Sequence, residues 1–185
     1  TFDKDGIPLV QYSWGTVYVP TTAFHWGLLS YSKWLMTGNI SYFEDAQKVA
    51  KWAIKNQTEF GAWAWNFDYT FSDGSAGKLL SGWTSAMTQG LGMSFLSRMY
   101  HSTNDNDYLH ASIKAIKPFQ TNIEDGGVKR KINNQYDWYE LYPTPLKGSY
   151  VLNGFLYSLI GLYDNWRTLN SVESKVLYDN GIETL

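Results

Sequence analysis

Residues 151–170 read VLNGFLYSLIGLYDNWRTLN, and this stretch decides the expected fold class. Its large apolar residues recur at the spacing of an amphipathic α-helix and give that helix a broad apolar surface. Gly154, Ser158 and Gly161 add a strip of small residues along the same helix. Because small side chains let a second helix approach closely, the stretch predicts a central, buried helix packed against a neighbour.

Two upstream segments repeat this arrangement, in which a helix carrying a glycine is followed by a turn and a second amphipathic helix. Gly27, Gly90 and Gly154 fall at matching places, 63 and 64 residues apart. A helical hairpin cannot bury its apolar face alone, so a period of this length predicts hairpins that stack side by side. We therefore expect residues 1–185 to form a single, mainly α domain whose stacked hairpins make up part of an α/α toroid, about half a ring.

Capping signatures mark the expected starts of two helices. Ser41 with Glu44 and Asn170 with Glu173 each match the capping box, in which a small polar residue and a Glu three residues later bond each other's backbone N–H groups. These pairs predict helices that begin close to residues 41 and 170.

Two long segments rich in aromatic and turn residues lie between the hairpins. Residues 60–78 alternate aromatic and small residues ahead of Asp73-Gly74, which predicts a short β-hairpin. Residues 124–147 contain GGVKRKIN and QYDWYELY, which read as two strands joined by Asn133-Asn134. Because long loops in a compact helical domain are usually functional, these one or two β-hairpins are where we expect a site.

The composition excludes several classes of function. The formal net charge of -2 and the pI of about 5.9 leave no global field that would attract nucleic acid or an anionic membrane. No apolar run approaches the ~20 residues of a transmembrane helix. Nine Trp and fourteen Tyr are heavy usage, which suits contact with carbohydrate as well as packing in a core.

The chain gives little information on its compartment. It has no Cys, which excludes disulfides and thiol chemistry. Secreted and cytosolic proteins can both lack Cys, so this absence does not indicate a compartment. It opens with TFDKDGIPLV, without the starting Met, basic segment and apolar segment of a signal peptide. We expect any signal or anchor to lie upstream, and a secretory or extracytoplasmic location fits that expectation.

Metal chemistry has no support in the sequence. His25, His101 and His110 lack the spacing of metal ligands, so we expect neither a metal nor another cofactor. Lys129, Arg130 and Lys131 form a basic cluster, which fits either the solvated edge of a strand or a clamp for carboxylate or sulfate groups.

The stretch YDWYELYPT, residues 136–144, is the best candidate for chemistry. If it forms a strand, Trp138, Glu140 and Tyr142 share one face, which would bring a ring, a carboxylate and a phenol together. A packed aromatic strand, a platform for sugar rings and an acid/base site all fit these residue types. With a pKa near 10, a tyrosine phenolate costs about 4 kcal/mol at pH 7, so an acid/base site must lower that pKa or form the phenolate only during proton transfer.

The block DWYELYPT, followed by YVLNGFLYSLIGLYD, resembles the C-terminal catalytic domain of D-glucuronyl C5-epimerase, the enzyme family that converts D-glucuronate into L-iduronate within heparan-type polysaccharides. The resemblance continues in GWTSAMTQGLGMS at residues 82–94, in GGVK at 126–129 and in LYDNGIETL at the end. It implies an α/α-toroid domain, isomerase activity and an acidic polysaccharide substrate. A homodimer is a candidate assembly.

The resemblance also implies a metal-independent mechanism that uses tyrosines. H5 is removed next to the uronate carboxylate, a carbanion or enolate forms, and a proton returns from the opposite face of the sugar, which requires groups on both faces. The tyrosine before Pro-Thr is catalytic in the family pattern and corresponds to Tyr142. The residues that we expect to bind substrate are Trp83, Gln89, Arg130, Trp138, Glu140 and Asn153.

Two departures from the family pattern bear on this expectation. The family typically has two glutamates before the tyrosine, whereas here Glu140 is followed by Leu141. Its other catalytic tyrosines fall in a segment beyond the position of Leu185, so we expect residues 1–185 to supply at most half of the catalytic machinery, one acid/base of the two that the reaction needs. A uronate polysaccharide lyase, which shares the proton abstraction, and a non-catalytic glycan-binding protein stay open as alternatives.

Overall fold

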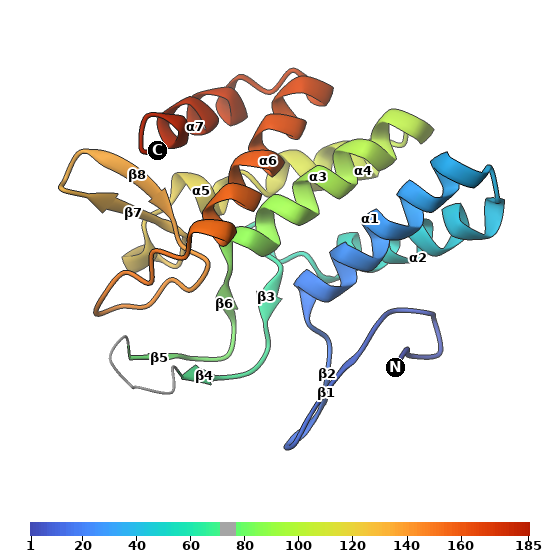
Figure 1. Cartoon of the computed structure of the whole chain (residues 1–185), viewed down its shortest axis with the longest axis horizontal. Helices are drawn as coiled ribbons and strands as arrows, with labels where there is room; N and C mark the ends of the chain where they lie inside the picture. The colour runs from blue at the N-terminus through green and yellow to red at the C-terminus, as the bar shows by residue number, and fades with distance from the viewer. Residues whose placement is uncertain (71–76) are drawn as a thin grey trace.

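Three helical hairpins form the molecule, which we describe from a computed structural model covering residues 1–70 and 77–185. The helices are α1 (Pro20–Thr37), α2 (Ile40–Asn56), α3 (Ala86–Thr103), α4 (Asn106–Lys114), the short α5 (Lys117–Gln120), α6 (Leu152–Leu169) and α7 (Val172–Ile182). The first helices of the hairpins, α1, α3 and α6, lie side by side, and α2, α4 and α7 each pack on their own partner (Figure 1). This arrangement confirms the predicted stack of hairpins.

Two of the glycines at matching places, Gly27 and Gly90, lie where the first helices make close contacts, whereas Gly154 lies against Leu141. A methyl group on Gly90 of α3 would lie 2.4 Å from the Tyr157 backbone oxygen, and one on Gly161 of α6 would lie 2.2 Å from the Gly90 oxygen. In α1, a methyl on Gly27 would lie 2.7 Å from the Phe95 ring. The small residues therefore permit contact between backbones, as the strip on α6 predicts.

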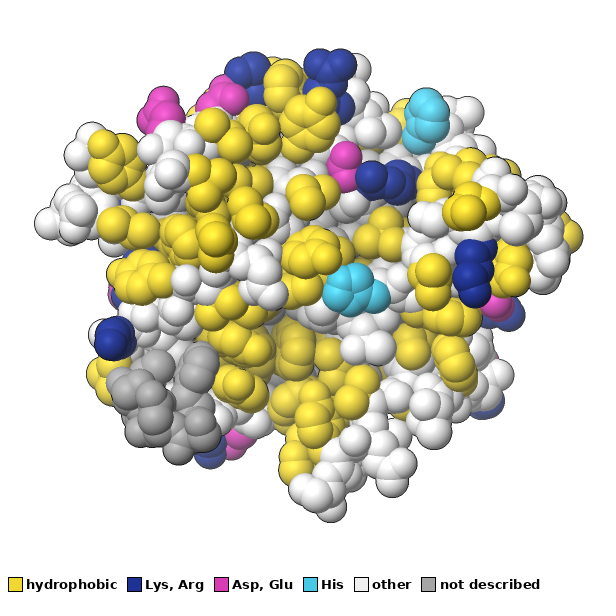
Figure 2. Space-filling view, viewed as in Figure 1, with side chains coloured by type: hydrophobic (Ala, Val, Ile, Leu, Met, Phe, Trp, Pro, Cys, Tyr) yellow, Lys and Arg dark blue, Asp and Glu magenta, His cyan; other side chains and the backbone are white. Residues whose placement is uncertain are grey.

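The prediction that α6 is buried holds for one of its faces only. Phe155 and Leu162 are completely buried against the neighbouring helices, whereas Leu152, Ile160 and Tyr163 are 53%, 49% and 41% exposed. Figure 2 shows the hydrophobic side chains that gather over α6 and α7 in the upper part of the view. The broad apolar surface read from the sequence thus has a packed half and an open half.

Short antiparallel strand pairs fill the loops between hairpins. In the described residues they are β1 (Val10–Tyr12) with β2 (Gly15–Val17), β3 (Ala64–Trp65) with β6 (Trp83–Thr84), β4 (Tyr69–Thr70) with β5 (Lys78–Leu79), and β7 (Lys129–Ile132) with β8 (Tyr136–Tyr139). The predicted turn at Asn133-Asn134 is confirmed, with φ values of 52° and 58°. Residues Asp73 and Gly74, the turn expected in the earlier hairpin, lie outside the described residues.

Both predicted capping boxes are wrong in their cap residue. Asn39, rather than Ser41, caps α2, and its side chain accepts a hydrogen bond from the Ser41 backbone N–H. Asn170 ends α6 in the left-handed conformation at φ 56°, and Ser171 caps α7 instead. Asn suits the left-handed position that ends a helix as well as the position that starts one, so the local pattern alone is ambiguous.

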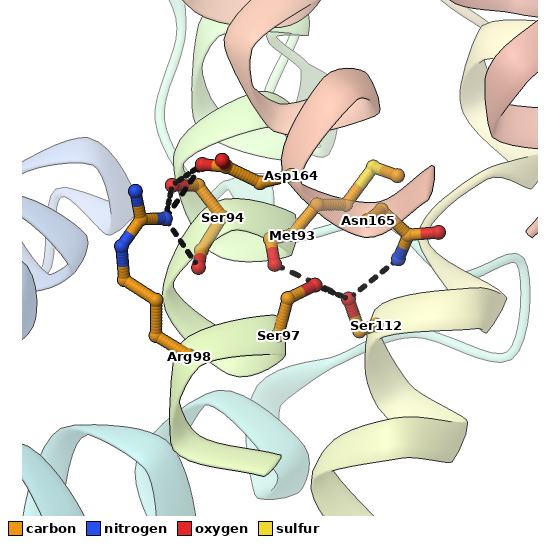
Figure 3. Close-up of polar contacts among 7 residues, drawn as sticks. All are labelled: Met93, Ser94, Ser97, Arg98, Ser112, Asp164 and Asn165. Carbon is orange, nitrogen blue, oxygen red and sulfur yellow. Dashed lines mark hydrogen bonds and ion pairs between the residues drawn. The ribbon is translucent and has the colours of Figure 1, made fainter. Parts of the chain in front are cut away.

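A buried polar network ties α3, α4, α6 and α7 together. The Asn165 amide nitrogen donates to Ser112 Oγ at 2.8 Å, and its oxygen accepts from Ser174 Oγ at 2.8 Å. Ser112 Oγ also lies 3.1 Å from Ser97 Oγ (Figure 3). We call Ser97, Ser112, Asn165 and Ser174 the polar network; all four are completely buried and satisfy one another.

Among the described residues, no helix is both long and apolar enough to cross a membrane.

Candidate active site: an aromatic edge around Tyr142

Loops rich in aromatic residues lie at one end of the helical layer. β2 leads into α1, β6 leads into α3, and the loop after β8 leads into α6. Because α1, α3 and α6 start at the same side of the layer, these loops meet there, as Figure 1 shows. Segments distant in the sequence are thereby brought to a common edge.

Tyr142 belongs to a continuous set of rings at this edge. Its ring stacks on that of Tyr69, with centroids 4.9 Å apart and planes at 5°, and it lies 5.9 Å from the Trp83 ring. Trp83 in turn stacks on Trp65 at 4.7 Å. We call Trp65, Tyr69, Trp83 and Tyr142 the aromatic edge. Such a set offers the flat apolar faces and polar tips that suit sugar rings.

Polar groups of the first helices hold the aromatic edge in place. Trp65 Nε1 donates to Thr88 Oγ1 of α3 at 3.0 Å, and Thr88 Oγ1 lies 2.6 Å from Thr21 Oγ1 of α1. The indole of Trp83 donates to the Phe67 backbone oxygen at 3.1 Å. The rings are therefore fixed by hydrogen bonds as well as by stacking.

The phenol of Tyr142 is half-buried and stays protonated at neutral pH. Burial is the largest cause that raises its pKa, to about 12, and the nearby Tyr69, through charge and a side-chain hydrogen bond, and Tyr12, through charge, add to the effect. At a pKa of about 12, forming the phenolate at pH 7 costs about 7 kcal/mol. In this state Tyr142 is a proton donor rather than a ready base.

Glu140 organises the loop that carries Tyr142. Its carboxylate is completely buried and accepts from Arg130 Nε at 3.0 Å, from Ser149 Oγ at 2.7 Å and from the Tyr150 backbone N–H at 3.2 Å. Arg130 also donates to the Thr144 backbone oxygen at 2.5 Å. The loop on both sides of Tyr142 is thus tied to one buried ion pair.

The Glu140 backbone extends the same connection to the helical layer. Its oxygen accepts from the Ala86 N–H at the start of α3, and its N–H donates to the Val128 oxygen, at 3.0 and 2.8 Å. The position of Tyr142 relative to α3 therefore depends on this residue.

The expectation that residues 138, 140 and 142 share a strand face is wrong, because β8 ends at Tyr139 and the chain is irregular beyond it. Trp138 is buried and stacks on Phe155 at 4.1 Å, away from the aromatic edge. Glu140 and Tyr142 remain close along the chain, but alternation does not set their directions.

The remaining predicted site residues differ in exposure. Gln89 is completely buried: its oxygen accepts from the Trp63 N–H at 2.9 Å, and its nitrogen donates to the Gly61 oxygen at 3.0 Å. Asn153 is exposed in the first turn of α6, where its Oδ1 lies 2.8 Å from the Gly154 nitrogen. Trp83 lies in the aromatic edge itself.

The predicted site residues did not include Tyr69, Trp65 and Thr88. Tyr69 stacks on Tyr142, Trp65 stacks on Trp83, and Thr88 accepts a hydrogen bond from Trp65. The alternating segment 60–78 contains two of them and predicted a hairpin, but no local signal placed that hairpin beside Tyr142. The described residues contain no group of three His, Asp or Glu side chains arranged to hold a metal ion.

The fold likeness to solved structures defines the class of protein. A family 76 glycoside hydrolase (mannosidase) from Bacteroides thetaiotaomicron superimposes with a TM-score of 0.58 at 13% identity, over 89% of this chain and 43% of the other. With its stacked hairpins, this chain is therefore a mainly α protein that forms part of an α/α toroid.

Similarity in sequence identifies the family within that class. The family model of the D-glucuronyl C5-epimerase C-terminus matches residues 55–185, and the chain belongs to this family. A D-glucuronyl C5-epimerase from Caenorhabditis elegans is 41% identical over 149 residues, which are 74% of this chain and 24% of that protein. An uncharacterized protein from Methanocaldococcus jannaschii is 30% identical over 134 residues, 71% of this chain and 41% of that one. The chain thus spans a quarter to two fifths of these relatives.

Proposed function

We propose that this chain carries part of the active site of an epimerase that inverts C5 of D-glucuronate within an acidic polysaccharide. The observation that carries the proposal is Tyr142, a half-buried phenol stacked in the aromatic edge and located in a family block. Membership of the D-glucuronyl C5-epimerase family supports the reaction and the substrate class.

Tyr142 acts in this proposal as the acid that returns a proton to C5. A phenol with a pKa of about 12 is a poor base at pH 7 but donates readily to a carbanion or enolate, which is far more basic. The same group serves as the base in the reverse direction, since each step runs backward through the same transition state. The reaction also needs a partner on the opposite face of the sugar ring.

The predicted binding residues divide into two groups. Asn153 is exposed and is proposed to contact the sugar, whereas Trp83 is 8% exposed and is proposed to support the ring of Tyr142 from within the protein. Glu140, Arg130 and Gln89 have their polar atoms engaged within the protein, so we assign them the positioning of the Tyr142 loop and of the segment around Trp63. Trp138 supports them by packing on Phe155.

Leu141 fits this division. A methyl group on Gly154 would lie 2.5 Å from Leu141 Cβ, so the side chain packs against the start of α6. An apolar residue at this position adds contact with α6, while Glu140 alone supplies the carboxylate that holds the loop. The single glutamate is therefore compatible with an ordered Tyr142.

Deuterium exchange tests the proposal. The native polypeptide that carries this chain, incubated in D2O with a glucuronate-containing polymer, is expected to place deuterium at C5, detected by NMR. No deuterium at C5 with any uronate polymer would contradict the proposed function. An unsaturated uronate product with ultraviolet absorbance would instead identify a lyase.

A homodimer is proposed as the assembly on the strength of the open half of α6. Large apolar residues remain exposed there and on α7, among them Leu156, Ile160 and Val176. Contiguous exposed apolar surface supports association. Sedimentation velocity of the native polypeptide tests this assembly, and a monomer at all concentrations would contradict it.

A further inference from the structure

The hairpin of β1 and β2 carries two exposed aromatic side chains that neither the reaction nor the family match uses. Trp14 is 57% exposed and Tyr12 is 38% exposed, and both precede residue 55, where the family match begins. Most Trp side chains of a folded domain are largely buried, because exposing an indole to water is unfavourable. An indole held open at a hairpin tip therefore requires an explanation.

The two rings form an ordered surface. Their centroids are 5.1 Å apart with planes at 3°, so Tyr12 and Trp14 stack face to face. The Phe67 ring packs against both, with centroids at 5.7 Å from Tyr12 and 5.3 Å from Trp14. We call Tyr12 and Trp14 the aromatic arm. Its rings are fixed before any ligand arrives, which reduces the entropy lost on binding.

The aromatic arm is continuous with the aromatic edge. Phe67 contacts Trp65 at 5.4 Å, and Trp65 stacks on Trp83, which lies beside Tyr142. The charge of Tyr12 is also among the causes that raise the Tyr142 pKa, consistent with a short distance between the two phenols. In Figure 1 the hairpin lies at the same end of the layer as the loops of the site.

We propose that the aromatic arm is a second sugar-binding subsite, which stacks against a non-reacting pyranose of the same polysaccharide chain whose glucuronate lies at Tyr142. The inference rests on the proposed function for the identity of the polymer. A sugar ring is the occupant that the arm favours, because its flat C–H face matches an aromatic plane and its hydroxyls remain in water. The rings from Trp14 to Tyr142 contact one another in turn. Phe67, Trp65 and Tyr142 keep part of their surface open to one polymer chain, and the 8% exposed Trp83 supports them from within.

The test compares glucuronate-containing oligosaccharides of two lengths by calorimetry on the native polypeptide. Trp14→Ala is expected to raise the Kd of a hexasaccharide roughly three- to tenfold, the range of a single aromatic contact, and to leave that of a disaccharide unchanged. Trp14→Phe keeps a flat face and is expected to retain most of the affinity. Tyr136→Ala is the matched control, because Tyr136 is 37% exposed at the start of β8 and is expected to leave both affinities unchanged.

An unchanged hexasaccharide Kd in Trp14→Ala would overturn the subsite, as would a wild-type protein that binds neither oligosaccharide. A changed sedimentation coefficient with unchanged affinity would assign the arm to protein association and overturn it too. The two experiments can refute the subsite and the proposed function separately. Exchange at C5, with an effect of Trp14→Ala that does not depend on oligosaccharide length, would refute the subsite alone. Length-dependent binding without exchange removes the reaction and supports the subsite.

Discussion

The polar network inside the helical layer and the aromatic edge at its end both contain side chains with polar atoms. The two regions differ in how completely these side chains are buried. In the network, Asn165, Ser112 and Ser174 bond one another and are completely buried. In the aromatic edge, Tyr142 is half-buried and its ring stacks on that of Tyr69. A closed, completely buried set of hydrogen bonds serves the framework, whereas a half-buried ring keeps part of its surface open to a ligand.

The ion pairs beside the two regions also differ in the exposure of their side chains. Arg130 and Glu140, beside the aromatic edge, have side chains 15% and 0% exposed, whereas Arg98 and Asp164, beside the polar network, are 38% and 18% exposed (Figure 3). A buried pair leaves an uncompensated charge when one partner is removed, and an exposed pair does not. The molecule thus places its most consequential ion pair next to the residue that we propose for catalysis.

Removal of the buried carboxylate is expected to have the largest effect. Glu140→Ala leaves Arg130 without its partner and frees the Ser149 and Tyr150 donors, so the free energy of unfolding should fall by about 3–5 kcal/mol, with loss of C5 exchange. Denaturant unfolding and the exchange assay measure the two effects. Asp164→Ala, which breaks the partly exposed pair and removes the acceptor of Ser94 Oγ, is the control and should cost about 1–2 kcal/mol. Equal losses in the two variants would remove the distinction between the regions.

A substitution in the polar network is expected to reduce stability but not chemistry. Asn165→Ala removes both amide hydrogen bonds and leaves Ser112 and Ser174 each short of a partner, at a cost of about 2–4 kcal/mol. Denaturant unfolding measures this loss, and the exchange rate well below the melting temperature should match the wild type. A reduced rate in the folded variant would show that the network takes part in function.

A substitution within the stack is expected to shift the pH dependence slightly. Tyr69 raises the Tyr142 pKa, so Tyr69→Phe should lower it from about 12. The alkaline limb of the exchange rate, where the donating phenol is lost, should then move to lower pH by less than about one pH unit, since burial, the largest cause, remains. Tyr163→Phe is the control and should leave the profile unchanged. If the alkaline limb does not move in Tyr69→Phe, Tyr69 does not contribute to the raised pKa of Tyr142.

Much of the helical layer could be predicted from the sequence. The positions of Gly27 and Gly90 located close contacts of the first helices, because close approach demands small residues wherever it occurs, whereas Gly154 meets Leu141 of the loop before α6. Caps were predicted less well, since Asn39 and Asn170 use the same side chain at opposite ends of helices. Which half of α6 is covered depends on its neighbours and could not be read from its own pattern.

The candidate site could be predicted only in part. Tyr142 was identified from its block, but its stacking on Tyr69 joins residues far apart in the chain and leaves no local signal. Alternation misplaced Trp138, because β8 ends three residues before Tyr142. For Glu140, residue type indicated a functional carboxylate, whereas burial and four donors make it the anchor of the loop.

Two tyrosines of one stretch, Tyr139 and Tyr142, differ in their expected contribution to proton transfer. Tyr139 is completely buried and donates to the Leu177 oxygen at 2.6 Å, whereas Tyr142 is proposed to donate to C5. In D2O with the glucuronate polymer, Tyr142→Phe should lower deuterium incorporation at C5 by about 10²-fold or more. Tyr139→Phe should cost about 1 kcal/mol of stability and leave incorporation intact in the folded protein. Wild-type incorporation in folded Tyr142→Phe would show that Tyr142 does not donate the proton to C5.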